Sequence, residues 1–139
     1  MQKTAAVLAF LQAQIQPEQP LYAIVDAAQD SKAILQLLKH AVPKLNIANL
    51  FEGERGEELA PAAPYLVEFT REGHPLLVKL ANQGWQRNWA VYFAYPNGFE
   101  NALHKLRRDI SVTDSDHMPM LFRFYDPNVF QRYLPLFDA

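Results

Sequence analysis

The stretch Leu21-Tyr22-Ala23-Ile24-Val25 is apolar throughout and ends at Asp26. A strand with one face in water alternates apolar and polar side chains, so a continuous apolar run indicates a strand that is covered on both faces. The run from Trp89 to Tyr95 is also apolar and aromatic without a charge, and it predicts the central strand of the sheet. Together the two runs predict a sheet with helices packed on it.

Apolar residues at helical spacing predict about five helices, at residues 4–14, 31–42, 75–83, 98–110 and 127–137. Asp30 is a candidate N-cap for the second helix, and Asp126 before Pro127 is the same signal for the last one. Pro75 suits the first turn of the third helix, and Gly84 suits its C-terminal cap.

Further strands are predicted at residues 46–51, 65–69, 111–113 and 120–125. The last two flank Asp114-Ser115-Asp116-His117, which is typical of a hairpin turn, so this pair is expected to be antiparallel. Residues 52–60 are polar and contain glycine, which predicts a loop or a single turn. The expected fold class is therefore α/β of the mixed α+β kind, with a mixed, partly antiparallel sheet of about six strands and about five packed helices.

Composition indicates one globular domain over residues 1–139. Hydrophobic residues make up 50% of the 139 residues and charged residues 20%, which excludes a disordered chain. Thirteen Lys and Arg against fifteen Asp and Glu leave a net charge of −2, which argues against a nucleic-acid partner. The absence of cysteine excludes disulfides, cysteine-based zinc sites and thiol nucleophiles.

The N-terminal residues resemble a short signal-peptide core from Ala5 to Leu11, but Gln12, Gln14 and Gln16 follow directly. The helical spacing of the apolar residues favours an amphipathic helix instead. No apolar run approaches the roughly 18 residues of a membrane span, so the cytoplasm is the expected location.

No catalytic or cofactor motif is present: the sequence has no Walker A loop, no Gly-x-Gly-x-x-Gly and no Gly-x-Ser-x-Gly. Carboxylates at predicted strand ends are the one candidate for acid/base chemistry, and they are Asp26, Glu52, Glu54 and Asp126. Caps, solvated loops and ion pairs are the favoured interpretation of these side chains.

Metal binding is not expected either. His117 with Asp114 and Asp116 comes nearest to a ligand cluster, but a turn rich in aspartate needs no metal. We therefore predict no catalytic residue, no cofactor and no metal.

Tryptophan and arginine are the residue types that most often anchor protein–protein interfaces. Trp85 and Trp89 enclose Arg87, and Arg123 with Tyr125 lies on one face of the predicted strand at 120–125. These five residues, Trp85, Arg87, Trp89, Arg123 and Tyr125, form the predicted partner-binding surface. A structural ion pair of Arg123 with Asp26, Glu52 or Asp126 is the alternative role for that arginine.

The basic cluster of Lys105, Arg107 and Arg108 lies near a predicted helix C-terminus, where cations complement the helix dipole. Nucleic-acid binding at this cluster would also require exposed aromatic side chains beside it. Most aromatic residues of the chain lie on predicted buried faces, so the helix-dipole interpretation is preferred.

Five segments in order resemble the N-terminal lobe of the adaptor-chaperones of bacterial type VI secretion effectors (the Tap or Tec type). They are Leu21-Tyr22-Ala23-Ile24-Val25-Asp26-Ala27-Ala28, Asn49-Leu50-Phe51-Glu52-Gly53, Ala63-Pro64-Tyr65-Leu66-Val67-Glu68, Gly84-Trp85 with Asn88-Trp89, and Leu121-Phe122-Arg123-Phe124-Tyr125-Asp126-Pro127. Each segment alone is weak, but the set in this order is specific.

The resemblance implies a non-enzymatic role. Members of that family bind a toxic effector protein in the producing cell and help load it onto the VgrG spike protein. Two other readings stay open from the residues themselves: a small hydrolase or transferase that uses strand-end carboxylates, and a protein-interaction module without a role in secretion.

Overall fold

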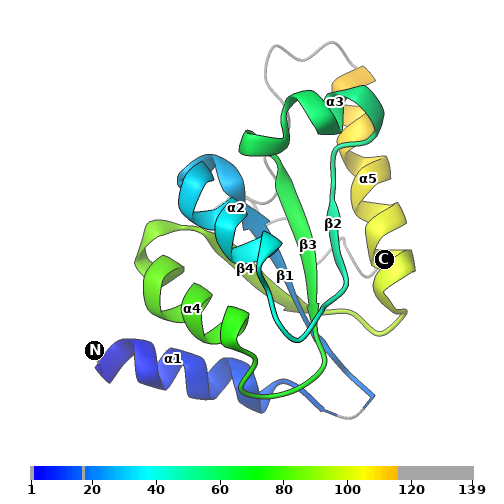
Figure 1. Ribbon diagram of the computed structural model, residues 1–139. Coiled ribbons are helices and arrows are strands. Elements are labelled where there is room, and N and C mark those ends of the chain that lie inside the picture. The colour runs from blue at the N-terminus through cyan, green and yellow to red at the C-terminus, as the bar shows by residue number, and fades with distance from the viewer. Residues whose placement is uncertain (1, 17, 116–139) are drawn as a thin grey trace.

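The computed structural model describes residues 2–16 and 18–115 of the chain (Figure 1). Within them, five helices pack on a four-stranded sheet whose strand order is β2-β3-β1-β4. The strands are β1 (Leu21–Asp26), β2 (Ile47–Asn49), β3 (Pro64–Phe69) and β4 (Ala90–Ala94). The fold class is mixed α+β, as the sequence predicts.

Every strand pair in the described sheet is antiparallel. Tyr22 of β1 lies opposite Glu68 of β3 on one side and Phe93 of β4 on the other. The prediction of a mixed sheet with about six strands is therefore wrong for the part of the sheet that the structure describes. Coverage by helices on both faces buries antiparallel strands as well as parallel ones, so apolar runs do not reveal strand direction.

The central position belongs to β1, whose residues are all buried, and to β3. Residues 89–95 were expected at the centre, but β4 lies at one end of the described strand order and its Ala94 is exposed. An apolar strand at this position is buried by what packs on its faces, so burial does not identify a central strand.

The helices are α1 (Gln2–Ala13), α2 (Ser31–Lys39), α3 (Gly53–Glu58), α4 (Pro75–Gly84) and α5 (Phe99–Ser115). Three short 3₁₀ turns connect elements: η1 (Ala27–Gln29), η2 (Ala60–Ala62) and η3 (Trp85–Arg87). Asp30 caps α2 as predicted, since its side chain accepts a hydrogen bond from the Ala33 amide at 3.4 Å. Helix α3 lies where the sequence predicted a loop or single turn.

The predicted strand at residues 111–113 is wrong, because α5 continues to Ser115. No glycine or proline occurs between Phe99 and Ser115 to end the helix earlier. The predicted strand at 120–125 and the predicted helix at 127–137 lie outside the described residues.

Helices α1, α2 and α4 cover one face of the sheet, and α5 covers the other (Figure 1). Alternate residues of β1 serve the two faces: Ala23 and Val25 pack with α2 and α4, while Tyr22 and Ile24 pack with α5. This arrangement confirms the prediction that residues 21–25 are covered on both faces. None of the described helices is long and apolar enough to cross a membrane.

Candidate functional site

The described segments that carry the family resemblance meet at the end of β1. Backbone hydrogen bonds join them there: Asp26 N to Trp89 O at 2.7 Å, Ala27 N to Ala63 O at 3.1 Å, and Leu50 N to Pro64 O at 2.9 Å. The side chains of Ala27 and Ala63 are fully buried. These segments therefore hold the end of the sheet together, and the functional surface must be sought among the side chains that they present outward.

The turn between α4 and β4 presents Trp85 outward, and Gly84 determines the shape of this turn. A Cβ atom on Gly84 would lie 2.6 Å from the Trp89 Cβ and 2.8 Å from two atoms of the indole ring. Glycine is required here for this close approach and not as a left-handed cap, since Gly84 has φ −108°. The left-handed residue of the turn is Asn88, with φ 59°.

The two tryptophans consequently differ in environment. Trp89 is 1% exposed and belongs to the core beside Gly84, whereas Trp85 is 44% exposed. The Trp85 ring stacks on Tyr92 with 6.5 Å between ring centroids, and the exposed Arg87 places its guanidinium carbon 5.9 Å from the Trp89 ring centroid. We call Trp85, Arg87 and Tyr92 the Trp85 surface.

Of the predicted partner-binding residues, Trp85 and Arg87 are both exposed and lie two positions apart in η3. Trp89 is corrected from an exposed anchor to a core residue that supports the turn, because the missing Cβ of Gly84 lets helix α4 close over its ring. Arg123 and Tyr125 lie outside the described residues. Sequence reasoning missed Tyr92, although its place in β4, opposite Ala23, puts it on the face covered by α4. Burial raises the pKa of the Tyr92 hydroxyl.

The strand-end carboxylates that the structure describes either cap a helical turn or lie exposed to solvent. Asp26 is buried and caps η1, since its two oxygens accept hydrogen bonds from the Ala28 amide at 3.1 Å and from Gln29 Nε2 at 3.0 Å. The Glu52 side chain is 61% exposed, Glu54 lies exposed in the first turn of α3, and Asp126 lies outside the described residues. Nothing in this geometry favours an acid/base pair over caps and solvated charges.

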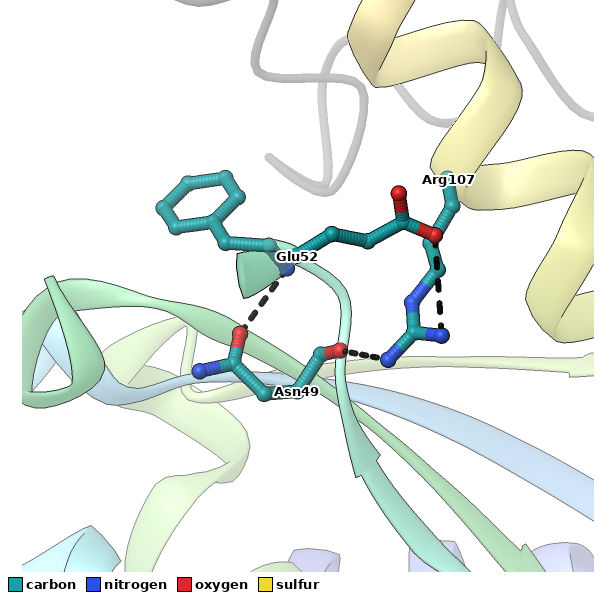
Figure 2. A network of polar contacts seen from close by, with 4 residues as sticks. Asn49, Glu52 and Arg107 are labelled. Atoms are coloured by element: carbon teal, nitrogen blue, oxygen red, sulfur yellow. Dashed lines mark hydrogen bonds and ion pairs between the residues drawn. The ribbon is translucent and has the colours of Figure 1, made fainter. Parts of the chain in front are cut away.

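Arg107 of α5 reaches across to the end of β2 (Figure 2). Its Nη2 donates to the Asn49 carbonyl at 2.7 Å, and its Nη1 lies 3.7 Å from the Glu52 carboxylate. The Asn49 side chain in turn accepts from the Phe51 amide at 2.9 Å and donates to the Gly56 carbonyl at 3.0 Å. Arg107 of the predicted basic cluster thus joins α5 to the loop before α3.

A cavity of about 410 Å³ opens between α2 and the first half of α4. We call it the α2–α4 groove and define it by its lining residues Gln36, Leu37, His40, Ala41, Val42, Pro75, Leu76 and Lys79. Val42 is 71% exposed, because α2 ends at Lys39 and not at residue 42 as expected. No pattern in the sequence predicts this groove.

His74 holds the wall of the groove in place. Its Nδ1 accepts a hydrogen bond from the Leu76 amide at 3.0 Å, which caps α4, and its Nε2 donates to the Pro43 carbonyl at 2.6 Å. The buried imidazole therefore joins residues 40–43 to the start of α4.

Among the described residues, no group of three His, Cys, Asp or Glu side chains is arranged to hold a metal. Asp114 of the expected Asp-rich turn lies in α5, and Asp116 and His117 lie outside the described residues.

The sheet with helices on both faces, the exposed Trp85 after the last residue of α4 and the groove at the first turns of that helix define a small α+β domain with outward-facing apolar side chains. The model of the DUF4123 family, described as a domain of unknown function, matches residues 21–139. The chain belongs to this family. Searches of curated proteins and of solved structures each found no match.

Proposed function

We propose that this chain is a non-enzymatic adaptor that binds a type VI secretion effector in the cytoplasm and helps load it onto the VgrG spike protein. The proposed partners are polypeptides, and the role requires no nucleic acid, cofactor or metal. All five segments of the resemblance lie within the residues that match the family. The family carries no assigned function, so the role rests on the resemblance and on the surface of the molecule.

The observation that carries the proposal is the exposure of Trp85. An indole with 44% of its surface in water, held by stacking on Tyr92 and with Arg87 two residues away, has the composition of an interface anchor. Tryptophan contributes a large apolar area at the cost of few rotatable bonds, so a preformed stack loses little entropy on binding.

An interaction module without a role in secretion would use the same surface, and only the identity of the partner separates the two. The hydrolase or transferase alternative gains no support, because Asp26 is occupied as a cap and Glu52 is largely solvated.

The test is capture of partners by the tagged chain in a type VI-positive cell, compared with an unrelated bait. We expect enrichment of an effector and of the spike protein. Trp85→Ala should weaken capture by about tenfold while the variant stays folded, because loss of the stack on Tyr92 costs only about 0.5–1.5 kcal/mol.

The matched control is Phe10→Ala, which removes another exposed aromatic side chain, 65% exposed on α1. This variant should capture partners as the wild type does. Absence of both effector and spike protein from the captured material would refute the proposal.

A further inference from the structure

The two walls of the α2–α4 groove belong to segments without acidic residues. Residues 31–51 and 73–99 contain no Asp or Glu, although the whole chain has a net charge of −2. Their cations are Lys32, Lys39, Lys44, Lys79 and Arg87. Positive charge is therefore concentrated on the α2 and α4 side of a weakly acidic protein, and such segregation attracts anionic partners.

One lysine lines the groove, and a second shares a helix face with a lining residue. Lys79 of α4 is a lining residue and is exposed, and it has no ion-pair partner among the residues that the structure describes. On α2, Lys32 is exposed and lies four residues before the lining residue Gln36, so the two share a helix face. Cationic side chains thus flank the opening from both helices.

Among the described residues, no carboxylate forms an ion pair with Lys32 or Lys79; Asp30, two residues before Lys32, accepts the Ala33 amide as the N-cap of α2. Glu68 lies at a neighbouring hollow beside Lys44, but its two oxygens accept hydrogen bonds from the Tyr22 hydroxyl and the Asn46 side-chain amide, each at 2.9 Å. Glu72 precedes α4 and is exposed in the turn after β3.

Apolar side chains supply part of the groove lining. Leu37 and Ala41 line it from the α2 side, Pro75 and the buried Leu76 line it from α4, and Val42 is exposed at its rim. Its volume of about 410 Å³ is within the range of roughly 300–1,000 Å³ that is common for ligand pockets. An apolar side chain inserted here would displace water from Leu37 and Val42.

We infer that the α2–α4 groove is the docking site for an acidic segment of the partner polypeptide, which inserts one apolar side chain and pairs its carboxylates with Lys79 and the lysines of α2. The inference rests on the proposed function in taking that partner to be the effector. Apolar insertion supplies affinity, and the lysines select acidic flanking residues.

A second copy of this chain is the competing occupant, because α3 and its flanks carry Glu52, Glu54, Glu57 and Glu58 followed by the partly exposed Leu59. It is the poorer candidate. Helix α3 is only six residues long; a hydrogen bond from Asn49 to Gly56 holds it against its own chain, and one from Tyr65 to Ala60 holds the following turn η2.

The binding test uses three labelled peptides and the full chain in an anisotropy titration. The first contains glutamates around leucine anchors, the second has lysines for the glutamates, and the third has serines for the leucines. We expect the glutamate–leucine peptide to bind at least about tenfold more tightly than the other two. Equal binding of the three peptides overturns the inference.

Variants locate the site. Lys79→Glu and Val42→Asp change exposed groove side chains and should weaken binding of the glutamate–leucine peptide by about fivefold to tenfold. The matched control is Arg108→Glu, an exposed charge reversal on α5 across the sheet, which should leave the dissociation constant within about twofold. The assignment is overturned if Arg108→Glu alone loses binding. It is also overturned if neither Lys79→Glu nor Val42→Asp weakens binding.

Binding of the purified effector to the wild type and to Lys79→Glu tests this inference separately from the proposed function. If the purified effector binds the wild type and Lys79→Glu equally, the groove assignment fails and the adaptor role stands. If the effector does not bind but the glutamate–leucine peptide does so through Lys79, the adaptor role fails and the groove remains a site for acidic segments.

Concentration-dependent dimerisation that disappears in Glu57→Lys with Glu58→Lys would identify a second copy as the occupant and overturn the inference.

Discussion

Replacement of Gly84 by alanine introduces one methyl group where the end of α4 packs directly against Trp89. The new Cβ would lie 2.6 Å from the Trp89 Cβ and 2.8 Å from the indole atoms Cδ2 and Cε3. Neither side can move easily, because Trp89 is 1% exposed and its carbonyl accepts the Asp26 amide at 2.7 Å. Relief of the overlap must shift packed atoms.

The expected free energy change follows from two opposing terms. Overpacking of a well-packed core costs about 1–3 kcal/mol. Alanine is better than glycine inside a helix by up to about 1 kcal/mol, but Gly84 is the last residue of α4, so this gain is realised only in part. We therefore expect Gly84→Ala to lower the free energy of unfolding by about 1–2 kcal/mol.

The assay is urea unfolding followed by circular dichroism, with the slope compared between variants. Asn82→Ala is the matched control, because Asn82 is exposed on the same helix and its replacement changes helix propensity alone. That variant should be as stable as the wild type or more stable by a few tenths of a kcal/mol. A Gly84→Ala protein as stable as Asn82→Ala would refute the argument that Trp89 requires glycine at this position.

Three further predictions concern other contacts. Asp30→Ala removes the N-cap of α2 and should lower the free energy of unfolding by about 1 kcal/mol in the same urea assay. Arg107→Ala breaks the hydrogen bond to the Asn49 carbonyl and should cost about 1.5–3 kcal/mol, whereas the exposed Arg108→Ala should stay within about 0.5 kcal/mol of the wild type. Burial, with the hydrogen bond to Glu68, raises the pKa of the Tyr22 hydroxyl, so the folded state retains this proton at a pH where the unfolded state releases it. Stability should fall as the pH rises above about 10, and urea titrations near pH 9 and pH 11 should show a smaller fall in Tyr22→Phe.

Local signals predicted most elements of the fold. The apolar run at residues 21–25 became β1, Asp30 became the cap of α2, and Pro75 became the first residue of α4. Each of these signals acts over a few neighbouring residues, which is why the sequence alone reveals it. Strand direction and strand order depend on contacts between distant segments, so the antiparallel order β2-β3-β1-β4 was not predictable from the runs.

The candidate site was predicted in part for a similar reason. Trp85 and Trp89 are the same residue type four positions apart, and the sequence proposed both as anchors. Only the approach of Gly84 separates them into an exposed ring and a core ring. The α2–α4 groove escaped prediction because α2 ends at Lys39, before the residues that line the rim.

Helix α4 also sets the distance between two surfaces. The groove lies at its first turns, through Pro75 and Lys79, and Trp85 directly follows its last residue. Trp85 lies ten positions after Pro75, which corresponds to about 15 Å at a rise of about 1.5 Å per residue. A single extended polypeptide that touches both ends of this helix needs its two anchors at least about five positions apart, at roughly 3.3 Å per residue.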